Sequence, residues 1–171
     1  MSHCKPRMDS RRTGLLLAIL LVSATGAAHA RIGYPGTRTE ITRYPYPILL
    51  TRLRQAVKAH HMAIVAQASA SHGASARGVK IPGNAVIMVF RNDFAVSMLK
   101  DSVAAGIEAP LRIYVTANST GTADITYRTP SAVFAPYHNS RLNALAQKLD
   151  RIFGAIVRSA AGPGAKAARL P

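Results

Sequence analysis

Cysteine is almost absent from the chain of 171 residues, because the only one, Cys4, lies close to the N-terminus. If the first 30 of the 171 residues are removed on export, the remaining 141 contain no thiol. They can then form no disulfide, and they offer neither a thiol nucleophile nor a thiolate ligand for a metal. We therefore expect one domain that is stabilised by the packing of its apolar side chains.

Acidic residues are also scarce. After residue 30 the carboxylates are Glu40, Asp93, Asp101, Glu108, Asp124 and Asp150, and no two stand at a spacing typical of paired acid and base catalysis. No serine lies in a Gly-x-Ser-x-Gly elbow, and the stretch GVKIPGN lacks the remaining glycine, the lysine and the hydroxyl residue of a phosphate-binding loop. The sequence therefore offers no support for a hydrolase or a kinase.

The histidines form no metal-binding pattern. His60 and His61 are adjacent near the end of a predicted helix, so their side chains should point in different directions. His138 is isolated, and the chain has neither a His-x-x-x-His motif nor a carboxylate pair beside a histidine. We expect no metal ion and no cofactor.

The charge is strongly one-sided, with 22 Lys and Arg against 7 Asp and Glu and a net charge of +15. Such a charge attracts anionic partners, which include phospholipid head groups, wall polymers, acidic proteins and nucleic acid. Nucleic acid is the least accessible of these to an exported protein, and we expect no nucleic-acid binding. The cations are scattered along the chain without a dense run, so a generally basic, soluble surface explains them equally well.

The chain has no long apolar run, since the block Leu15–Val22 is far shorter than the roughly 20 residues of a membrane helix. Basic residues precede this block, and Ala28 and Ala30 form a small-x-small site after it. This order is typical of a cleavable signal peptide, residues 1–30. It predicts that no transmembrane segment remains after cleavage and that the protein is periplasmic or secreted. An uncleaved anchor is the alternative. Ser10-Arg11-Arg12 also leaves twin-arginine export open beside the ordinary route.

The first half of the remaining chain predicts alternating strands and helices. Residues 31–38 form an extended N-terminal segment, followed by a strand over 39–44 and an amphipathic helix over 47–61 that begins with Pro47. A short apolar strand covers 62–69, small residues connect it over 71–78, and the apolar run 84–90 predicts an interior strand. Asp93 should cap a helix over 94–105, with Met98, Leu99 and Val103 facing inward and Gly106 as a left-handed stop.

The second half predicts a hairpin and a long helix. Residues 110–118 and 122–128 alternate apolar and polar around the turn Asn-Ser-Thr-Gly, and leucines and isoleucines step by three and four over 139–160. Residues 161–171 should be a disordered tail. The order strand-helix-strand-strand-helix-strand-strand-helix predicts one α+β domain, residues 39–160, with a mostly antiparallel sheet and helices packed on one face.

The stretch from Thr39 to Tyr137 resembles the bacterial family named domain of unknown function 302. The motifs that carry the resemblance are His72-Gly73-Ala74, Val86 to Phe90 followed by Arg91-Asn92-Asp93, Ala109-Pro110-Leu111, Gly121, and Tyr127-Arg128-Thr129-Pro130. The sequence departs from the family at Ser71, where an aspartate is usual, and at Arg91, Asp93 and Ala109. The resemblance implies a compact domain, often paired, for which no reaction is established.

Three residues near strand ends form the candidate ligand site: His72, Asn92 and Tyr127. A neutral imidazole can bind a metal or move a proton, and an amide and a phenol can orient a polar ligand. Ser71 cannot supply the charge of the family's aspartate, which weakens an acid-base role for His72. The alternative is that His72 is a hydrogen-bonded structural residue, that Asp93 caps a helix and that Asn92 shapes a turn.

Three functions remain open on these grounds. The first is an exported, non-enzymatic domain that binds a small ligand or a protein partner, as a homodimer formed through an exposed sheet or helix. The second is an enzyme or redox accessory protein that uses His72 and Tyr127 around a metal or haem. The third is a basic envelope protein held on anionic surfaces by its charge.

Overall fold

The computed structural model describes Met1 and residues 34–168; the rest of the predicted signal segment, with Ala28 and Ala30, lies outside the described part of the chain. The strands and helices follow one another as β1 (Thr37–Ile41), α1 (Tyr46–Ala59), β2 (Ala63–Ala68), α2 (Ala70–Ser75), β3 (Asn84–Phe90), α3 (Asn92–Asp101), η1 (Ala104–Glu108), β4 (Leu111–Ala117), β5 (Ala123–Arg128), α4 (Pro130–Phe134), η2 (Ala135–Tyr137), α5 (Ser140–Ala161) and β6 (Lys166–Ala167). The 3₁₀ helices are labelled η.

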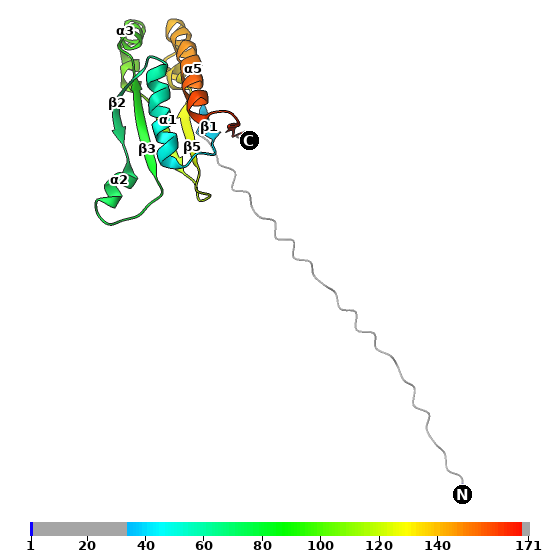
Figure 1. Cartoon of the computed structure of the whole chain (residues 1–171). Coiled ribbons are helices and arrows are strands. Elements are labelled where there is room, and N and C mark those ends of the chain that lie inside the picture. The colour runs from blue at the N-terminus through cyan, green and yellow to red at the C-terminus, as the bar shows by residue number, and fades with distance from the viewer. Residues whose placement is uncertain (2–33, 169–171) are drawn as a thin grey trace.

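The strands form one sheet in the order β2-β3-β4-β5-β1-β6, and every neighbouring pair is antiparallel. Helices α1 and α5 lie side by side across one face of this sheet (Figure 1). The predicted α+β fold with a mostly antiparallel sheet is confirmed. None of the helices in the described residues is long and apolar enough to cross a membrane.

The core lies between the sheet and these two helices. On β4, Leu111, Ile113 and Val115 are buried, whereas Arg112 and Tyr114 between them are exposed. This alternation follows from the pleat, which turns successive side chains to opposite faces. The inward residues of β3 and β5 pack with Leu53 of α1 and Phe153 of α5, both completely buried. The opposite side, which we call the open face, carries the intervening residues of these strands.

Helix α5 begins as the sequence predicts. Asn139 is its N-cap, and the side-chain oxygen of Asn139 accepts a hydrogen bond of 3.0 Å from the backbone N–H of Leu142. Its apolar stripe is buried at Leu142, Leu149 and Ile156 and half-buried at Leu145 and Ile152. The stripe therefore packs on the chain's own sheet.

Helix α3 differs from the prediction at both ends. It starts at Asn92, and Asp93 does not cap it, because the carboxylate of Asp93 pairs with Arg91 at 2.7 Å and 3.0 Å. The helix ends at Asp101, where the side chain of Asn139 donates to the backbone carbonyl at 2.8 Å. Gly106 lies within η1 and has no positive φ. The residues that α3 buries are Phe94 and Met98, whereas Leu99 and Val103 are exposed, contrary to the prediction.

Two segments that we expected to be irregular are ordered. Residues 71–78, predicted as a connection, contain α2, whose start is capped by the Ser69 hydroxyl accepting from the His72 N–H at 3.1 Å. The predicted disordered tail 161–171 contains the end of α5 and strand β6, and the Ala168 N–H donates to the Thr39 carbonyl at 2.8 Å. Strand β1 starts at Thr37, two residues before the predicted start. Residues 169–171 lie outside the description.

Candidate functional site

The three predicted site residues do not come together. His72 lies in α2, which adjoins the start of β3, and Asn92 lies in α3, which follows the end of β3. The seven residues of β3 separate the two by about 20 Å at roughly 3.3 Å per residue. Helices α2 and α3 accordingly lie at opposite ends of the sheet (Figure 1). Tyr127 lines neither the groove beside His72 nor the surface around Arg91 and Phe94. The prediction that these three residues form one site is therefore wrong.

His72 lines a groove of about 540 Å³ between α1 and the β2–α2 segment, together with Tyr46, Leu50, Arg54, Gln67, Ser69 and Ser71. The imidazole is exposed, and within residues 34–168 it makes no hydrogen bond, so it is not the bonded structural histidine that we considered. Ser71, where the family usually has aspartate, ties α2 to β3 through hydrogen bonds of 3.0 Å and 3.3 Å with the backbone of Asn84. Its hydroxyl therefore serves the fold.

Asn92 is the exposed first residue of α3, and its surroundings are those of a helix start. The neighbouring Arg91 lies over the Phe94 ring at 3.7 Å and holds Asp93. The hydrogen bond from Arg91 lowers the pKa of Asp93 below its usual value of 3.8. The segment is a structural joint between β3 and α3.

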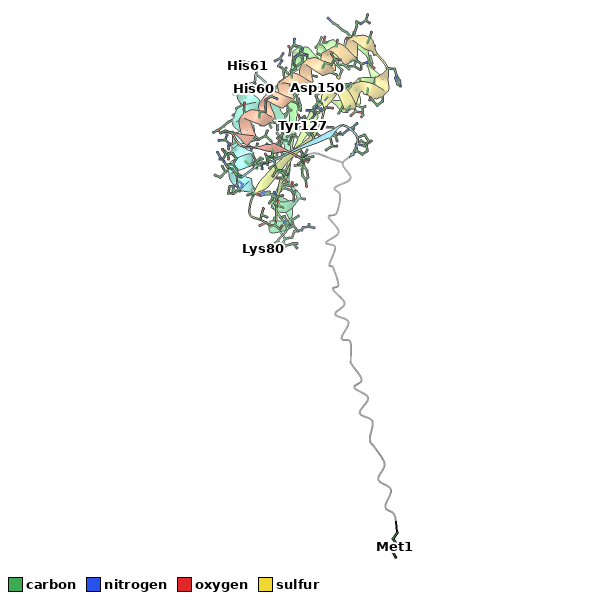
Figure 2. The ribbon with its side chains drawn as sticks, turned by 90° about the vertical axis from the view of Figure 1, so that its right-hand side faces the viewer. Met1, His60, His61, Lys80, Tyr127 and Asp150 are labelled. Atoms are coloured by element: carbon green, nitrogen blue, oxygen red, sulfur yellow. The ribbon has the colours of Figure 1, made fainter. Side chains whose placement is uncertain are left out.

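Tyr127 faces a different hollow, on the helix side of the sheet, which we call the Tyr127 groove. It has a volume of about 440 Å³ and is lined by Arg38, Glu40, Tyr127, Thr129, Asp150, Arg151, Gly154, Val157 and Arg158. Tyr127 on β5 and Asp150 on α5 lie close together there (Figure 2). Asp150 accepts from the backbone N–H of Ser131 at 2.9 Å, so this carboxylate anchors the start of α4.

Burial raises the pKa of Tyr127 above its usual value of 10.0; Arg38 opposes the rise, and Glu40 and Asp150 reinforce it. Because the folded state holds this proton more tightly, its contribution to stability is fully present below pH about 10 and is lost as the pH rises through the folded pKa. We expect the free energy of unfolding to fall above pH 10 and to fall less in Tyr127→Phe. Chemical denaturation from pH 8 to 11 measures this, and identical slopes in both proteins would contradict it.

The paired histidines play separate parts. His60 caps the end of α1 and lies 3.0 Å from the Ser159 hydroxyl through its Nε2, whereas His61 is exposed in a left-handed conformation. Both lie far from the Lys80 tip of the molecule (Figure 2). The described residues contain no group of three or more His, Cys, Asp or Glu side chains that could hold a metal ion.

The open face carries a more specific arrangement, two arginines at facing positions. In the β4–β5 ladder Ile113 pairs with Tyr127, so Arg112 stands opposite Arg128 one position further along. Facing side chains on an antiparallel pair lie about 5 Å apart at their Cβ atoms, and like charges there are destabilising. Within residues 34–168 neither guanidinium has a carboxylate partner in an ion pair. The sheet thus concentrates positive charge that it does not neutralise.

The arginines line a hollow of about 270 Å³, which we call the open-face hollow. Its other lining residues are Thr37, Val86, Glu108, Leu111, Tyr114, Thr126, Tyr127 and Val133. The rim offers hydroxyls and apolar contacts around a net charge of +1 from two guanidiniums and one carboxylate. Glu108 is engaged by Tyr137, whose hydroxyl donates to Oε1 at 3.2 Å.

Arg128 is held in place but incompletely satisfied. One terminal nitrogen donates to the Ala132 carbonyl at 3.2 Å, and the guanidinium lies 4.7 Å from the centre of the Tyr34 ring. Its Nε is buried and has no hydrogen-bond partner among the described residues. A buried N–H donor without an acceptor costs free energy, so such groups are rare in folded proteins. An acceptor atom of a ligand in the hollow would satisfy the Nε–H of Arg128.

Residues 38–159 match the family model described as "Domain of unknown function DUF302". This match covers more than half of the chain. The chain belongs to the DUF302 family. The resemblance found in the sequence motifs is therefore confirmed.

The fold of this DUF302 domain is shared with a solved structure, "Crystal structure of uncharacterized conserved protein DUF302 from Bacillus stearothermophilus". The two align with a TM-score of 0.66 and 16% identity, over 74% of this chain and 99% of the other. The likeness shows a common fold. No curated protein matches the chain.

Sequence reasoning missed the arginine pair of this DUF302 domain although a signal was present. The hairpin and its turn were both predicted, and counting outward from the turn sets Arg112 against Arg128. The predicted hairpin register therefore already placed two positively charged side chains opposite each other. Glu108 and Thr37 carry no such signal, because only the fold brings η1 and β1 to the hollow.

Proposed function

We propose that this DUF302 domain is an exported binding protein that holds a small carboxylate or phosphate anion in the open-face hollow. The observation that carries the proposal is the facing pair Arg112 and Arg128, neither of which has an ion-pair partner in the described residues. Guanidinium groups bind such oxyanions with two parallel hydrogen bonds. An anion between the two would remove their repulsion and give the buried Nε of Arg128 an acceptor.

The size and surroundings of the hollow favour a small ligand. Its volume of about 270 Å³ lies below the usual range for drug-sized molecules. Thr37, Tyr114 and Thr126 can hydrogen-bond the polar part of a ligand, and Val86 can contact its apolar part. After residue 30 the 18 Lys and Arg exceed the 6 Asp and Glu by 12, and this positive charge would raise the local concentration of any anion. We propose binding without a reaction, because the hollow pairs no nucleophile with a base.

The signal-like order of residues 1–30 supports export, and we place the binding in the periplasm. An exported solute-binding domain meets free anions directly, which suits a hollow of this kind. The same net charge also draws the protein to anionic envelope polymers. Salt separates the two modes, since attachment through diffuse charge fades at high ionic strength more than binding in a shaped hollow.

Thermal unfolding with added anions tests the proposal. We expect inorganic phosphate and acetate to stabilise the purified protein saturably, by about 2.7 kcal/mol at a concentration 100 times the dissociation constant. Choline chloride at matched ionic strength controls for salt. Equal stabilisation by phosphate, acetate and choline salts would contradict a specific anion site.

A further inference from the structure

The Tyr127 groove is lined by charges of both signs. Its charged lining residues are Arg38 and Glu40 of β1 with Asp150, Arg151 and Arg158 of α5. Within residues 34–168 the structure shows no ion pair between any of these arginines and either carboxylate. The groove, of about 440 Å³, is large enough for a small molecule. Opposite charges that line one groove without pairing are free to bind the charged groups of a ligand.

The register of the sheet places the charges of β1 beside Tyr127. Arg38 pairs with Tyr127 in the β1–β5 ladder, and Glu40, two residues further on, points to the same side. Because the Tyr127 ring packs against α5, this is the helix side of the sheet. Lys166 of β6 pairs with Ile41 and therefore belongs to the opposite face. The two β1 charges thus line the gap between the sheet and α5.

Helix α5 presents a row of three residues to the same groove. Asp150, Gly154 and Arg158 follow one another in steps of four and therefore lie on one side of the helix. Glycine is unfavourable inside a helix, but here it leaves room for a side chain. A Cβ on Gly154 would lie 3.1 Å from the Nη1 atom of Arg158, so this arginine lies back over the glycine. Its guanidinium is then roughly 6 Å along the helix axis from the level of Asp150.

Tyr127 supplies a polar group among these charges. It exposes only 6% of its surface, and in the described part of the chain its hydroxyl takes part in no hydrogen bond. Burial raises the pKa of Tyr127, and two arginines and two carboxylates of the groove also act on it, which places all four charges near the hydroxyl. The hydroxyl is protonated at neutral pH and can donate a hydrogen bond to a ligand.

We propose that the Tyr127 groove binds a small zwitterion, the ammonium and carboxylate unit of a free amino acid. Arg38 and Arg158 bind the carboxylate, to which the Tyr127 hydroxyl also donates. Glu40 and Asp150 bind the ammonium. An anion alone is repelled by the two carboxylates, and a cation alone is repelled by the arginines. The site is separate from the open-face hollow, because the two lie on opposite faces of the sheet.

Nuclear magnetic resonance of the arginine Nε–H groups during addition of glycine tests the proposal. Glycine carries both charges, whereas acetate and methylammonium carry one each. We expect glycine to shift the Arg38 and Arg158 signals saturably, and acetate and methylammonium to bind there at least ~10-fold more weakly. The glycine shifts should persist in Arg112→Gln, in which the open-face site is removed. Failure of one site can therefore be told from failure of the other.

Gly154→Ala separates binding from stability. A Cβ at this position displaces the Arg158 guanidinium, so glycine should bind about 10-fold more weakly. The same change favours the helix, so the melting temperature should rise. Gly73→Ala in α2 is the matched control, because its Cβ would meet no atom within 4 Å, and it should bind glycine unchanged. Arg158→Gln should weaken glycine binding by at least ~10-fold.

Three results would overturn the proposal. The first is that the Arg38 and Arg158 signals stay in place at about 100 mM glycine, far above the roughly 1 mM dissociation constant of a weak complex. The second is equal shifts with glycine and acetate, which would make the groove a second anion site. The third is an unchanged affinity for glycine in both Gly154→Ala and Arg158→Gln, which would place the ligand elsewhere.

Discussion

Replacing Arg112 by glutamine is expected to weaken phosphate or acetate binding by at least ~100-fold, because a charge-assisted pair of hydrogen bonds to the anion is lost. Arg112 is exposed and makes no ion pair within the described residues, so its replacement removes no interaction that stabilises the fold. The change also relieves the repulsion from Arg128 across the ladder. The free energy of unfolding without ligand should therefore stay constant or rise by about 0.5 kcal/mol.

Weaker anion binding together with unchanged stability in Arg112→Gln would show that Arg112 serves binding and not the fold. Calorimetric titration gives the affinity, and urea denaturation gives the stability of the same variant. Arg77→Gln removes one positive charge from an exposed site after α2 and is the matched control, which should bind as the unmodified chain does. If Arg77→Gln lost as much affinity as Arg112→Gln, the loss would come from the lower net charge of the protein, which would contradict a specific role of Arg112 in binding.

Replacing Phe153 by alanine is expected to lower the free energy of unfolding by about 3–5 kcal/mol. Phe153 is completely buried, and its ring centre lies 6.1 Å from that of Tyr127 on β5. The residue therefore joins α5 to the sheet in a chain that has no disulfide among its described residues. Its loss leaves a cavity that the surrounding strands cannot close completely.

Urea denaturation checks the Phe153→Ala prediction, with Ile48→Ala as a control on an exposed helix position. Ile48 exposes about half of its surface, so its truncation should change the stability by no more than about 0.5 kcal/mol. Similar losses in the two variants would show that α5 does not hold the sheet through this contact.

The regular part of the fold was readable from periodicity. Leu111, Ile113 and Val115 alternate with polar residues over the predicted strand, and Asn139 precedes the apolar stripe of the last helix. Both patterns are local, so they predict local structure well. The order of the main strands and helices followed from them.

Features that depend on distant partners were not readable. Helix α2 is held by Ser71 on Asn84, thirteen residues away, and β6 exists because β1 offers it a free edge. Asp93 could cap a helix by its position, but Arg91 competes for its carboxylate. The inward prediction for Val103 assumed a longer helix than Asn139 and Ser102 allow.

The error in the candidate site has a single geometric cause. His72 lies in the helix before β3 and Asn92 in the helix after it. The two ends of one strand lie at opposite ends of the sheet, so these two residues are kept apart. Strand-end residues meet when the ends themselves lie at the same edge. Arg112 and Arg128 meet because they hold facing positions in one hairpin.

Nuclear magnetic resonance of the arginine Nε–H groups, recorded while phosphate is added to the purified protein, tests the anion site most directly. We predict a large, saturating shift of the Arg128 Nε–H signal and a smaller shift for Arg112, with the signals of Arg54 and Arg158 unchanged. An Arg128 signal that stays in place at a phosphate concentration that stabilises the protein would contradict the account.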